Sequence, residues 1–209
     1  MNISFSSREL RDLAVAWVAL GVAFAIFFAG GGSRALSVLL TEGLVGPLLV
    51  SLLTAGLGFL LHELAHKVVA VRFDQIAEFR ADYGMLFLAV MSALVGFLFA
   101  APGAVHHRGR LTPRQHGLIA LAGPVTNGLL ALVFAPMYVV GLAVGSPLLS
   151  LVGARGVAIN LFLAAFNLVP FGALDGRTVL DWSKLVFVCT FVPAAALAIL
   201  VVFVLGIGF

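Results

Sequence analysis

Residues 62 to 66 read HELAH, which places two histidines and a glutamate close together in the chain. Positions i and i+4 share one face of a helix, so the imidazoles of His62 and His66 can bind one metal ion together. Glu63 points about 100° away around the helix, near such a metal without being its ligand. Two neutral nitrogen ligands and a carboxylate base are the groups with which a zinc hydrolase activates water. The pattern therefore predicts a catalytic site for one zinc ion, with Glu63 as the general base.

A catalytic zinc needs a third protein ligand and keeps its fourth position for water. After Asp82, the acidic residues are Asp175 and Asp181, and Asp175 lies in the stretch FNLVPFGALDGR. The Pro and Gly residues of this stretch interrupt an apolar helix, which can turn the Asp175 carboxylate inward. An aspartate beside a glycine at a helix end is equally typical of a cap or a turn. On this pattern alone, ligand and cap both stay open.

The chain around these residues is unusually apolar. Of its 209 residues, 62% are hydrophobic and 10% are charged, whereas soluble domains carry about 25% charged residues. Six apolar runs approach or exceed the roughly 20 residues that span a bilayer: 13–29, 44–61, 83–101, 117–144, 156–171 and 185–209. We therefore expect an all-α polytopic membrane protein that forms one domain over residues 1–209, with a catalytic core at about 44–180.

The basic residues favour five membrane crossings over six. If every run crosses, the twelve Lys and Arg residues divide six against six between the two sides. If the run at 83–101 enters and leaves by the same face, they divide ten against two, with Arg34 and Arg155 in the minority. The positive-inside rule favours this second arrangement, which has a re-entrant or interfacial segment between the HELAH helix and the next helix. A sixth spanning helix is the alternative, because about 19 residues suffice to cross.

The five-crossing arrangement also lets Asp175 reach the histidines. His62 and His66 come late in their run, near its basic end, and Asp175 comes late in its own run. With six crossings these helix ends point to opposite membrane faces, whereas with five they share the inner leaflet. Charge bias and ligand geometry, which are independent, therefore favour the same fold.

The remaining features indicate a membrane environment rather than a second function. The net charge of +3 is scattered over short loops, which argues against a nucleic-acid partner and favours lipid headgroups. We expect residues 1–12 to form a solvated or interfacial leader and residues 73–82 to form a solvated connection. Thr112, followed by Pro113, is expected to begin the next helix.

Three motifs occur in order along the chain: HELAH, AGPVTN at 122–127 and NLVPFGALDG at 167–176. Together they resemble the site-2 protease family, the intramembrane zinc metalloproteases of peptidase family M50, over about residues 44–180. The resemblance implies a multi-pass zinc endopeptidase of the cell membrane that cuts a transmembrane segment of another protein in regulated intramembrane proteolysis. It implies that His62, His66 and Asp175 bind zinc, that Glu63 is the base, and that two amides position the substrate or the oxyanion; these are Asn127 and Asn167.

Members of this family place a membrane-embedded strand or re-entrant loop between their first two core helices, where it holds the substrate in extended form. Here FLFAAPGAV at 97–105 occupies that place, although the connection is unusually apolar. No PDZ or CBS domain follows, so the chain is similar to the compact archaeal and bacterial members.

Two other functions fit the same polar residues. A metal or proton transport pathway could be lined by the residues of the predicted centre, but the paired repeats of transporters are not evident. A proteolytically silent scaffold would normally have lost one of these residues. The sequence does not predict the substrate, its cleavage position, the oligomeric state or the mechanism that gates access to the site.

Overall fold

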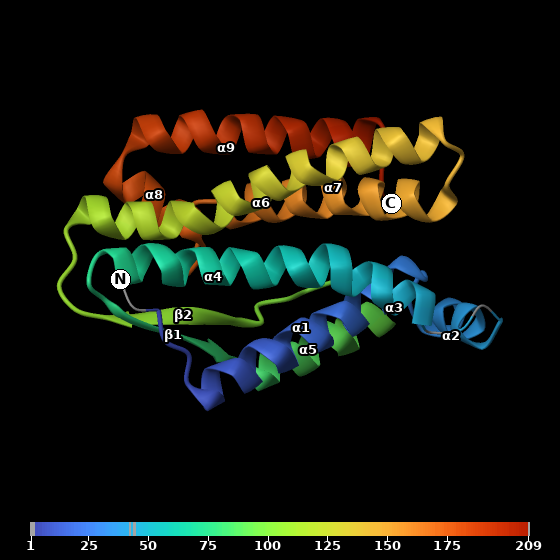
Figure 1. The fold of residues 1–209 in the computed structure, drawn as a ribbon, viewed down its shortest axis with the longest axis horizontal. Helices are drawn as coiled ribbons and strands as arrows, with labels where there is room; N and C mark the ends of the chain where they lie inside the picture. Colours follow the sequence, from blue (N-terminus) through green and yellow to red (C-terminus); the bar gives the residue numbers. More distant parts are fainter. Residues whose placement is uncertain (1–2, 42, 44, 209) are drawn as a thin grey trace. The chain divides into compact units, whose positions relative to one another are not determined.

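The computed structural model describes residues 3–41, 43 and 45–208, apart from the side chain of Leu39. The first residue of the predicted run 44–61 and the last residue of the run 185–209 therefore lie outside the described part. Within this part the chain is helical except for one two-stranded sheet (Figure 1). The elements are α1 Ser7–Phe28, α2 Gly32–Thr41, α3 Val45–Ser51, the π-helix η1 Leu52–Gly56, α4 Leu57–Arg72, β1 Ile76–Ala81, α5 Tyr83–Leu94, β2 Gly103–Arg108, α6 Pro113–Ala143, α7 Pro147–Asn167, α8 Asp175–Trp182, α9 Lys184–Ala198 and the π-helix η2 Ile199–Val204.

The described residues include five helical segments that are long and apolar enough to cross a membrane: Ser7–Phe28, Val45–Arg72, Pro113–Ala143, Pro147–Asn167 and Lys184–Val204. The run at 83–101 forms only α5, which has 12 residues and measures about 18 Å, against about 30 Å for the hydrocarbon core. Gly96 follows with a φ of 83°, beyond the end of α5. The protein is thus an all-α polytopic membrane protein with five candidate spans. Whether α5 enters the membrane stays a prediction.

The chain folds as two compact units. Unit 1 consists mainly of Leu61–Ala77 and His107–Phe209, and unit 2 consists of Ser4–Leu60 and Glu78–His106. Helix α4 and both strands contribute residues to each unit.

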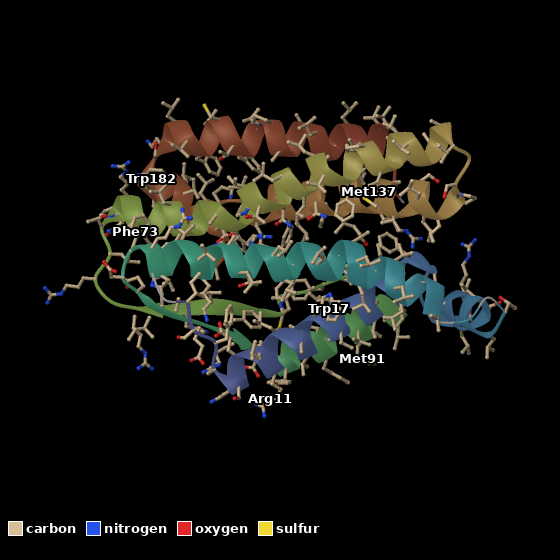
Figure 2. All side chains as sticks on the ribbon, in the orientation of Figure 1. Arg11, Trp17, Phe73, Met91, Met137 and Trp182 are labelled. Carbon is tan, nitrogen blue, oxygen red and sulfur yellow. The ribbon has the colours of Figure 1, made fainter. Side chains whose placement is uncertain are left out.

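Unit 1 is a helical bundle in which α6 lies beside α7, and α7 beside α9 (Figure 1). Its core includes Ala131, Leu161 and Ala198, one from each helix. Small residues let the backbones approach, because a Cβ on Gly153 of α7 would lie 2.2 Å from the Tyr138 nitrogen of α6. At the start of α6, Gly117 leaves space for the indole of Trp182 at the end of α8 (Figure 2).

Helix starts in unit 1 follow local capping signals. Thr112 and Gln115 form a capping box before α6, with Pro113 at its first turn, which confirms the predicted start. Ser146 caps α7 by accepting from the Leu149 N–H, and Pro147 follows it. The predicted run at 156–171 left Arg155 just outside it, whereas α7 starts at this earlier cap and carries Arg155 in its middle.

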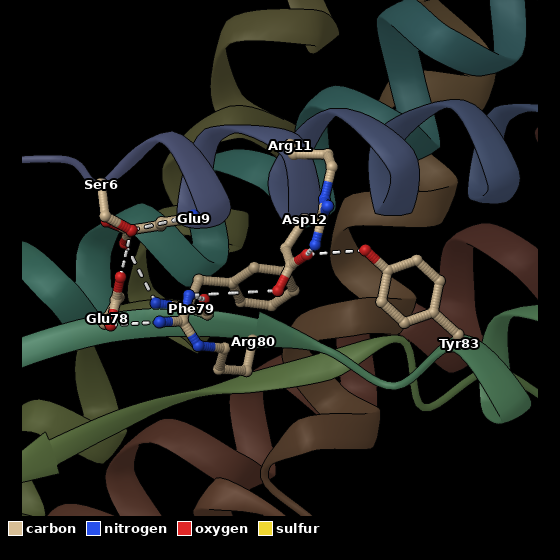
Figure 3. A network of polar contacts seen from close by, with 8 residues as sticks. All are labelled: Ser6, Glu9, Arg11, Asp12, Glu78, Phe79, Arg80 and Tyr83. Carbon is tan, nitrogen blue, oxygen red and sulfur yellow. Dashed lines mark hydrogen bonds and ion pairs between the residues drawn. The ribbon is translucent and has the colours of Figure 1, made fainter.

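Unit 2 holds α1 against β1 and α5 through a polar network around two buried carboxylates (Figure 3). We call this network the α1 anchor; it comprises Glu9, Asp12, Glu78, Arg80 and Tyr83. Glu9 and Asp12 are 0% and 1% exposed, and α1 starts at Ser7. The expectation of a solvated or interfacial leader is therefore wrong for Glu9 and Asp12, whereas the residues between Ser7 and Arg11 other than Glu9 are exposed. Residues 1–2 lie outside the described part. The two carboxylates are buried because donors meet them: the Phe79 N–H donates to Glu9 Oε1 over 3.0 Å, and the Tyr83 hydroxyl donates to Asp12 Oδ1 over 2.6 Å.

The connection expected at 73–82 contains strand β1 instead. Its charged residues conceal an alternation in which Ala77 and Phe79 are buried and the residues between them are less so. The Phe79 ring packs edge-on against Phe59, with centroids 5.8 Å apart. The partner strand β2 begins at Gly103, inside the segment 97–105 that occupies the place of the family's membrane-embedded strand or re-entrant loop.

Candidate metal centre

Unit 1 brings together the three predicted zinc ligands. His62 and His66 lie on α4, and Asp175 is the first residue of α8. The two Nε2 atoms are 3.0 Å apart, and Asp175 Oδ2 lies 3.3 Å from His62 Nε2 and 3.4 Å from His66 Nε2. Among the described residues, these three form the one group of His, Cys, Asp or Glu side chains that could hold a metal ion.

The spacing of these three atoms suits zinc. Ligand atoms about 2.0 to 2.1 Å from a tetrahedral zinc lie about 3.3 to 3.4 Å from one another. The observed separations of 3.0, 3.3 and 3.4 Å are close to this edge length. Two imidazole nitrogens and one carboxylate oxygen are also a donor set found in catalytic zinc sites. One zinc ion therefore fits the residues present.

The far nitrogen of each imidazole faces an oxygen atom. His62 Nδ1 lies 2.6 Å from Asn127 Oδ1, and His66 Nδ1 lies 2.7 Å from the Ile119 carbonyl oxygen. Since a carbonyl oxygen can only accept, His66 donates from Nδ1, and its neutral ring keeps the lone pair on Nε2. Such contacts to the far nitrogen orient metal-binding histidines.

Helix α6 leaves the space in front of the histidines open. A Cβ on Gly123 would lie 2.5 Å from the Nε2 atoms of both His62 and His66. That distance is shorter than real Cβ contacts, so even alanine would collide with the ligand atoms. Sterics thus explain why the AGPVTN motif has glycine at position 123: any side chain there would enter the metal position.

The loop after α7 delivers the third ligand. Helix α7 ends at Asn167, and Gly172 adopts a φ of 60°, which favours glycine. Asp175 is then the first residue of α8, where Leu174 takes the cap position without a side-chain hydrogen bond. The cap interpretation of Asp175 therefore does not apply. A Cβ on Gly176 would lie 2.0 Å from the Leu168 carbonyl oxygen, so this glycine lets α8 pack closely on the loop.

The centre is enclosed on the histidine side and more open at Asp175. The three polar residues of the HELAH motif are buried: His62, Glu63 and His66 are between 5% and 8% exposed. The Asp175 side chain is 18% exposed, and its Oδ2 receives no hydrogen bond from the described residues.

The two amides singled out in the sequence have different surroundings. Asn127 is 0% exposed on α6 and contacts both His62 and Asn160 of α7. Asn167 is partly exposed at the end of α7 and donates within its own helix, to the Leu163 carbonyl. The sequence analysis missed Asn160, although an amide in the middle of an apolar run is itself a signal of function.

Comparison with known proteins identifies the chemistry. A protein of Methanocaldococcus jannaschii named "putative zinc metalloprotease MJ0611" is 39% identical over 191 residues, which cover 90% of this chain and 92% of that protein. The chain belongs to this family of zinc metalloproteases. A protein of Bacillus subtilis named "putative zinc metalloprotease YwhC" is 31% identical over 145 residues, which cover 62% of this chain and 66% of that protein. No family model and no solved structure matches the chain. As a zinc metalloprotease it is a hydrolase with zinc as its cofactor.

Proposed function

We propose that this zinc metalloprotease cleaves a transmembrane segment of another protein inside the cell membrane, as site-2 proteases do. One observation carries the proposal: the ligand pair His62 and His66 lies within Val45–Arg72, a 28-residue helical segment apolar enough to span a bilayer. An enzyme that acted only on soluble peptides would have no need to bury its hydrolytic centre in such a segment, where ionisable residues are costly.

We assign the zinc ligands to His62, His66 and Asp175 and the general base to Glu63. A bound zinc would polarise the scissile carbonyl and lower the pKa of a water molecule. Glu63, the neighbour of His62 and itself buried, would accept the proton of that water and pass it to the leaving amine. The more exposed side of the centre, at Asp175, is the side on which water would arrive.

A helical substrate must unwind before a peptide bond can be attacked, and its freed backbone groups then need partners inside the membrane. A free strand edge supplies such partners by β-addition. In β1 the Phe79 N–H donates to Glu9 instead of to a strand, so this edge is occupied at that residue. In β2 every second residue is exposed. We propose β2 as the strand that holds the substrate, because it begins inside the segment 97–105, which occupies the place of the family's substrate-holding strand or loop. We retain Asn167, whose side chain is partly exposed, as a substrate-positioning amide.

The test uses purified protein in proteoliposomes with two substrates that carry the same scissile sequence. One substrate holds this sequence within its transmembrane helix, and the other holds it in a soluble loop. We expect cleavage inside the transmembrane segment, mapped by mass spectrometry, and faster cleavage when Gly or Pro is introduced there to loosen the helix. Cleavage confined to the soluble loop would contradict the proposal.

Two variants check the assigned roles in the same assay. Glu63→Gln should keep zinc but lose cleavage, because the amide cannot accept the proton. Asp175→Ala should lose both zinc and cleavage. Cleavage by Glu63→Gln at the wild-type rate would show that Glu63 is not the general base. Ion flux without cleavage in the wild-type protein would favour the transport alternative.

A further inference from the structure

We infer that Asn160 and Asn127 form an amide relay that fixes which nitrogen of His62 carries the proton. The inference rests on the proposed role of His62 as a zinc ligand. It assigns Asn127 as a positioning residue behind the metal centre, in place of the substrate contact that the resemblance implied, and it adds Asn160, which no motif had singled out.

The relay runs through three helices of unit 1. Asn160 Nδ2 donates to the Gly156 carbonyl oxygen of its own helix α7 over 2.9 Å. Asn127 Nδ2 of α6 donates to Asn160 Oδ1 over 2.9 Å, and Asn127 Oδ1 lies 2.6 Å from His62 Nδ1 of α4. Both asparagines are 0% exposed.

The direction of each bond follows from the first one. A backbone carbonyl can only accept, so the Gly156 oxygen requires the NH₂ group of Asn160. The Asn160 oxygen then faces Asn127 and requires that residue's NH₂ group, which turns the Asn127 oxygen toward His62. That oxygen also only accepts, so His62 Nδ1 must donate. The neutral imidazole therefore keeps its lone pair on Nε2, the atom that lies 3.3 Å from Asp175 Oδ2.

Without Asn160, the Asn127 NH₂ group loses the acceptor that holds it away from His62, and the turned-over amide becomes accessible. Its NH₂ group would then face His62 Nδ1, which would have to accept, and the imidazole proton would move to Nε2. A protonated Nε2 cannot bind zinc, because the ligand nitrogen must be deprotonated. His66 needs no such relay, since the Ile119 carbonyl oxygen that faces its Nδ1 is a backbone atom and cannot turn over.

A purely structural role for the two amides, in which they join α6 to α7, makes a different prediction. Interhelical amide bonds strengthen packing in membranes, so their loss would lower the melting temperature without a selective effect on zinc. The relay instead predicts a loss of zinc affinity in protein that is still folded. Zinc affinity therefore separates the two roles.

The test compares two asparagines of the same helix. Asn160→Leu removes the relay, whereas Asn167→Leu removes an amide seven residues later that makes the same bond to its own helix, over 3.0 Å to the Leu163 carbonyl. Zinc affinity is measured on each purified full-length protein in detergent by competition with a chromophoric chelator. We expect Asn160→Leu to bind zinc about 10- to 100-fold more weakly, as is typical for outer-shell partners, and Asn167→Leu to stay within about twofold of wild type. If Asn160→Leu does not fold, Asn160→Ala removes the same amide with less added volume.

A rescue variant makes the inference specific. Asn127→Asp replaces the amide with a carboxylate, which accepts from His62 Nδ1 whichever way it turns. In the Asn127→Asp background, Asn160→Leu should therefore lose its effect, and the double variant should bind zinc more tightly than Asn160→Leu alone. Wild-type affinity in Asn160→Leu, or a double variant no tighter than Asn160→Leu, would overturn the relay while the metal centre stands. Wild-type protein that binds no zinc would overturn the metal centre itself.

Discussion

The metal centre of unit 1 and the α1 anchor of unit 2 both contain buried carboxylate oxygens, but they differ in whether hydrogen-bond donors face these acceptors. In the α1 anchor, donors face acceptors: the Tyr83 hydroxyl and the Phe79 N–H meet the carboxylates of Asp12 and Glu9. In the metal centre, the Nε2 lone pairs of the two histidines face one another and the Asp175 carboxylate. A cation between them, whether a proton or a metal ion, turns that arrangement from repulsive to attractive. Burial alone thus does not distinguish a functional cluster from a structural one, whereas the match of donors to acceptors does.

This contrast predicts opposite effects of removing charge. Asp175→Asn should lower cleavage about a thousandfold or more, because it removes a zinc ligand worth at least about 4 kcal/mol of transition-state stabilisation. In chelator, the same variant should melt at the wild-type temperature or above it, since the new amide can donate to a histidine Nε2. Proteolysis and thermal unfolding on the same preparation measure both effects. A lower melting temperature in chelator would place Asp175 in a structural role.

A methyl group should close the metal position. Gly123→Ala puts a Cβ 2.5 Å from both Nε2 atoms, so we expect zinc affinity and cleavage to fall about a hundredfold or more. Gly128→Ala is the matched control, because a Cβ at that position of the same helix meets nothing within 4 Å. Equal zinc affinity in the two variants would show that the metal binds elsewhere.

Zinc removal should destabilise the protein only through the metal centre. Zinc at a thousand times its dissociation constant stabilises the folded state by about 4 kcal/mol, so chelation should lower the melting temperature of the wild type. Asp175→Asn should show no such shift, and a variant of the α1 anchor should show the full one. A chelator-dependent shift that survives in Asp175→Asn would separate the zinc site from this centre.

Loss of one donor in the α1 anchor should cost stability without affecting zinc. Tyr83→Phe removes the hydroxyl that donates to Asp12 over 2.6 Å and leaves a buried carboxylate oxygen without that bond. Bonds to charged groups contribute about 1.5 to 3 kcal/mol, so the melting temperature should fall by several degrees. Zinc affinity measured in parallel should stay at the wild-type value. A loss of zinc affinity in this variant would show that zinc binding depends on the α1 anchor.

The smallest effect is expected at the exposed pair on α8. Arg177 and Asp181 form an i, i+4 ion pair with side chains 61% and 62% exposed. Such pairs contribute about 0.3 to 0.5 kcal/mol, so Asp181→Ala should change both melting temperature and cleavage only slightly. If Asp181→Ala lost as much cleavage as Asp175→Asn, the negative charge of α8 as a whole would matter, and not Asp175 as a single ligand.

The sequence predicted features that depend on local spacing. The i, i+4 histidines, the capping signal at Thr112 and the apolar spans all lie within single helices, so their periodicity is visible in the chain. Asp175 was predicted through topology, because the charge bias placed two distant helix ends on one membrane face. The structure brings them together.

The features that the sequence analysis missed depend on partners far along the chain. Burial of Glu9 required the Phe79 N–H, 70 residues away, and the amide of Asn127 meets that of Asn160 on the next helix. Strand β1 was concealed because its charged residues suggested a solvated connection, although they alternate with buried ones. Such long-range pairs leave no periodic pattern in a single sequence.

X-ray absorption at the zinc edge, on wild-type protein and on Asp175→Asn, tests the central claim most directly. The account predicts one zinc per chain in the wild type, with two imidazole nitrogens and one carboxylate oxygen about 2.0 to 2.2 Å away. It also predicts loss of that zinc in Asp175→Asn. An unchanged zinc spectrum and stoichiometry in Asp175→Asn would contradict it.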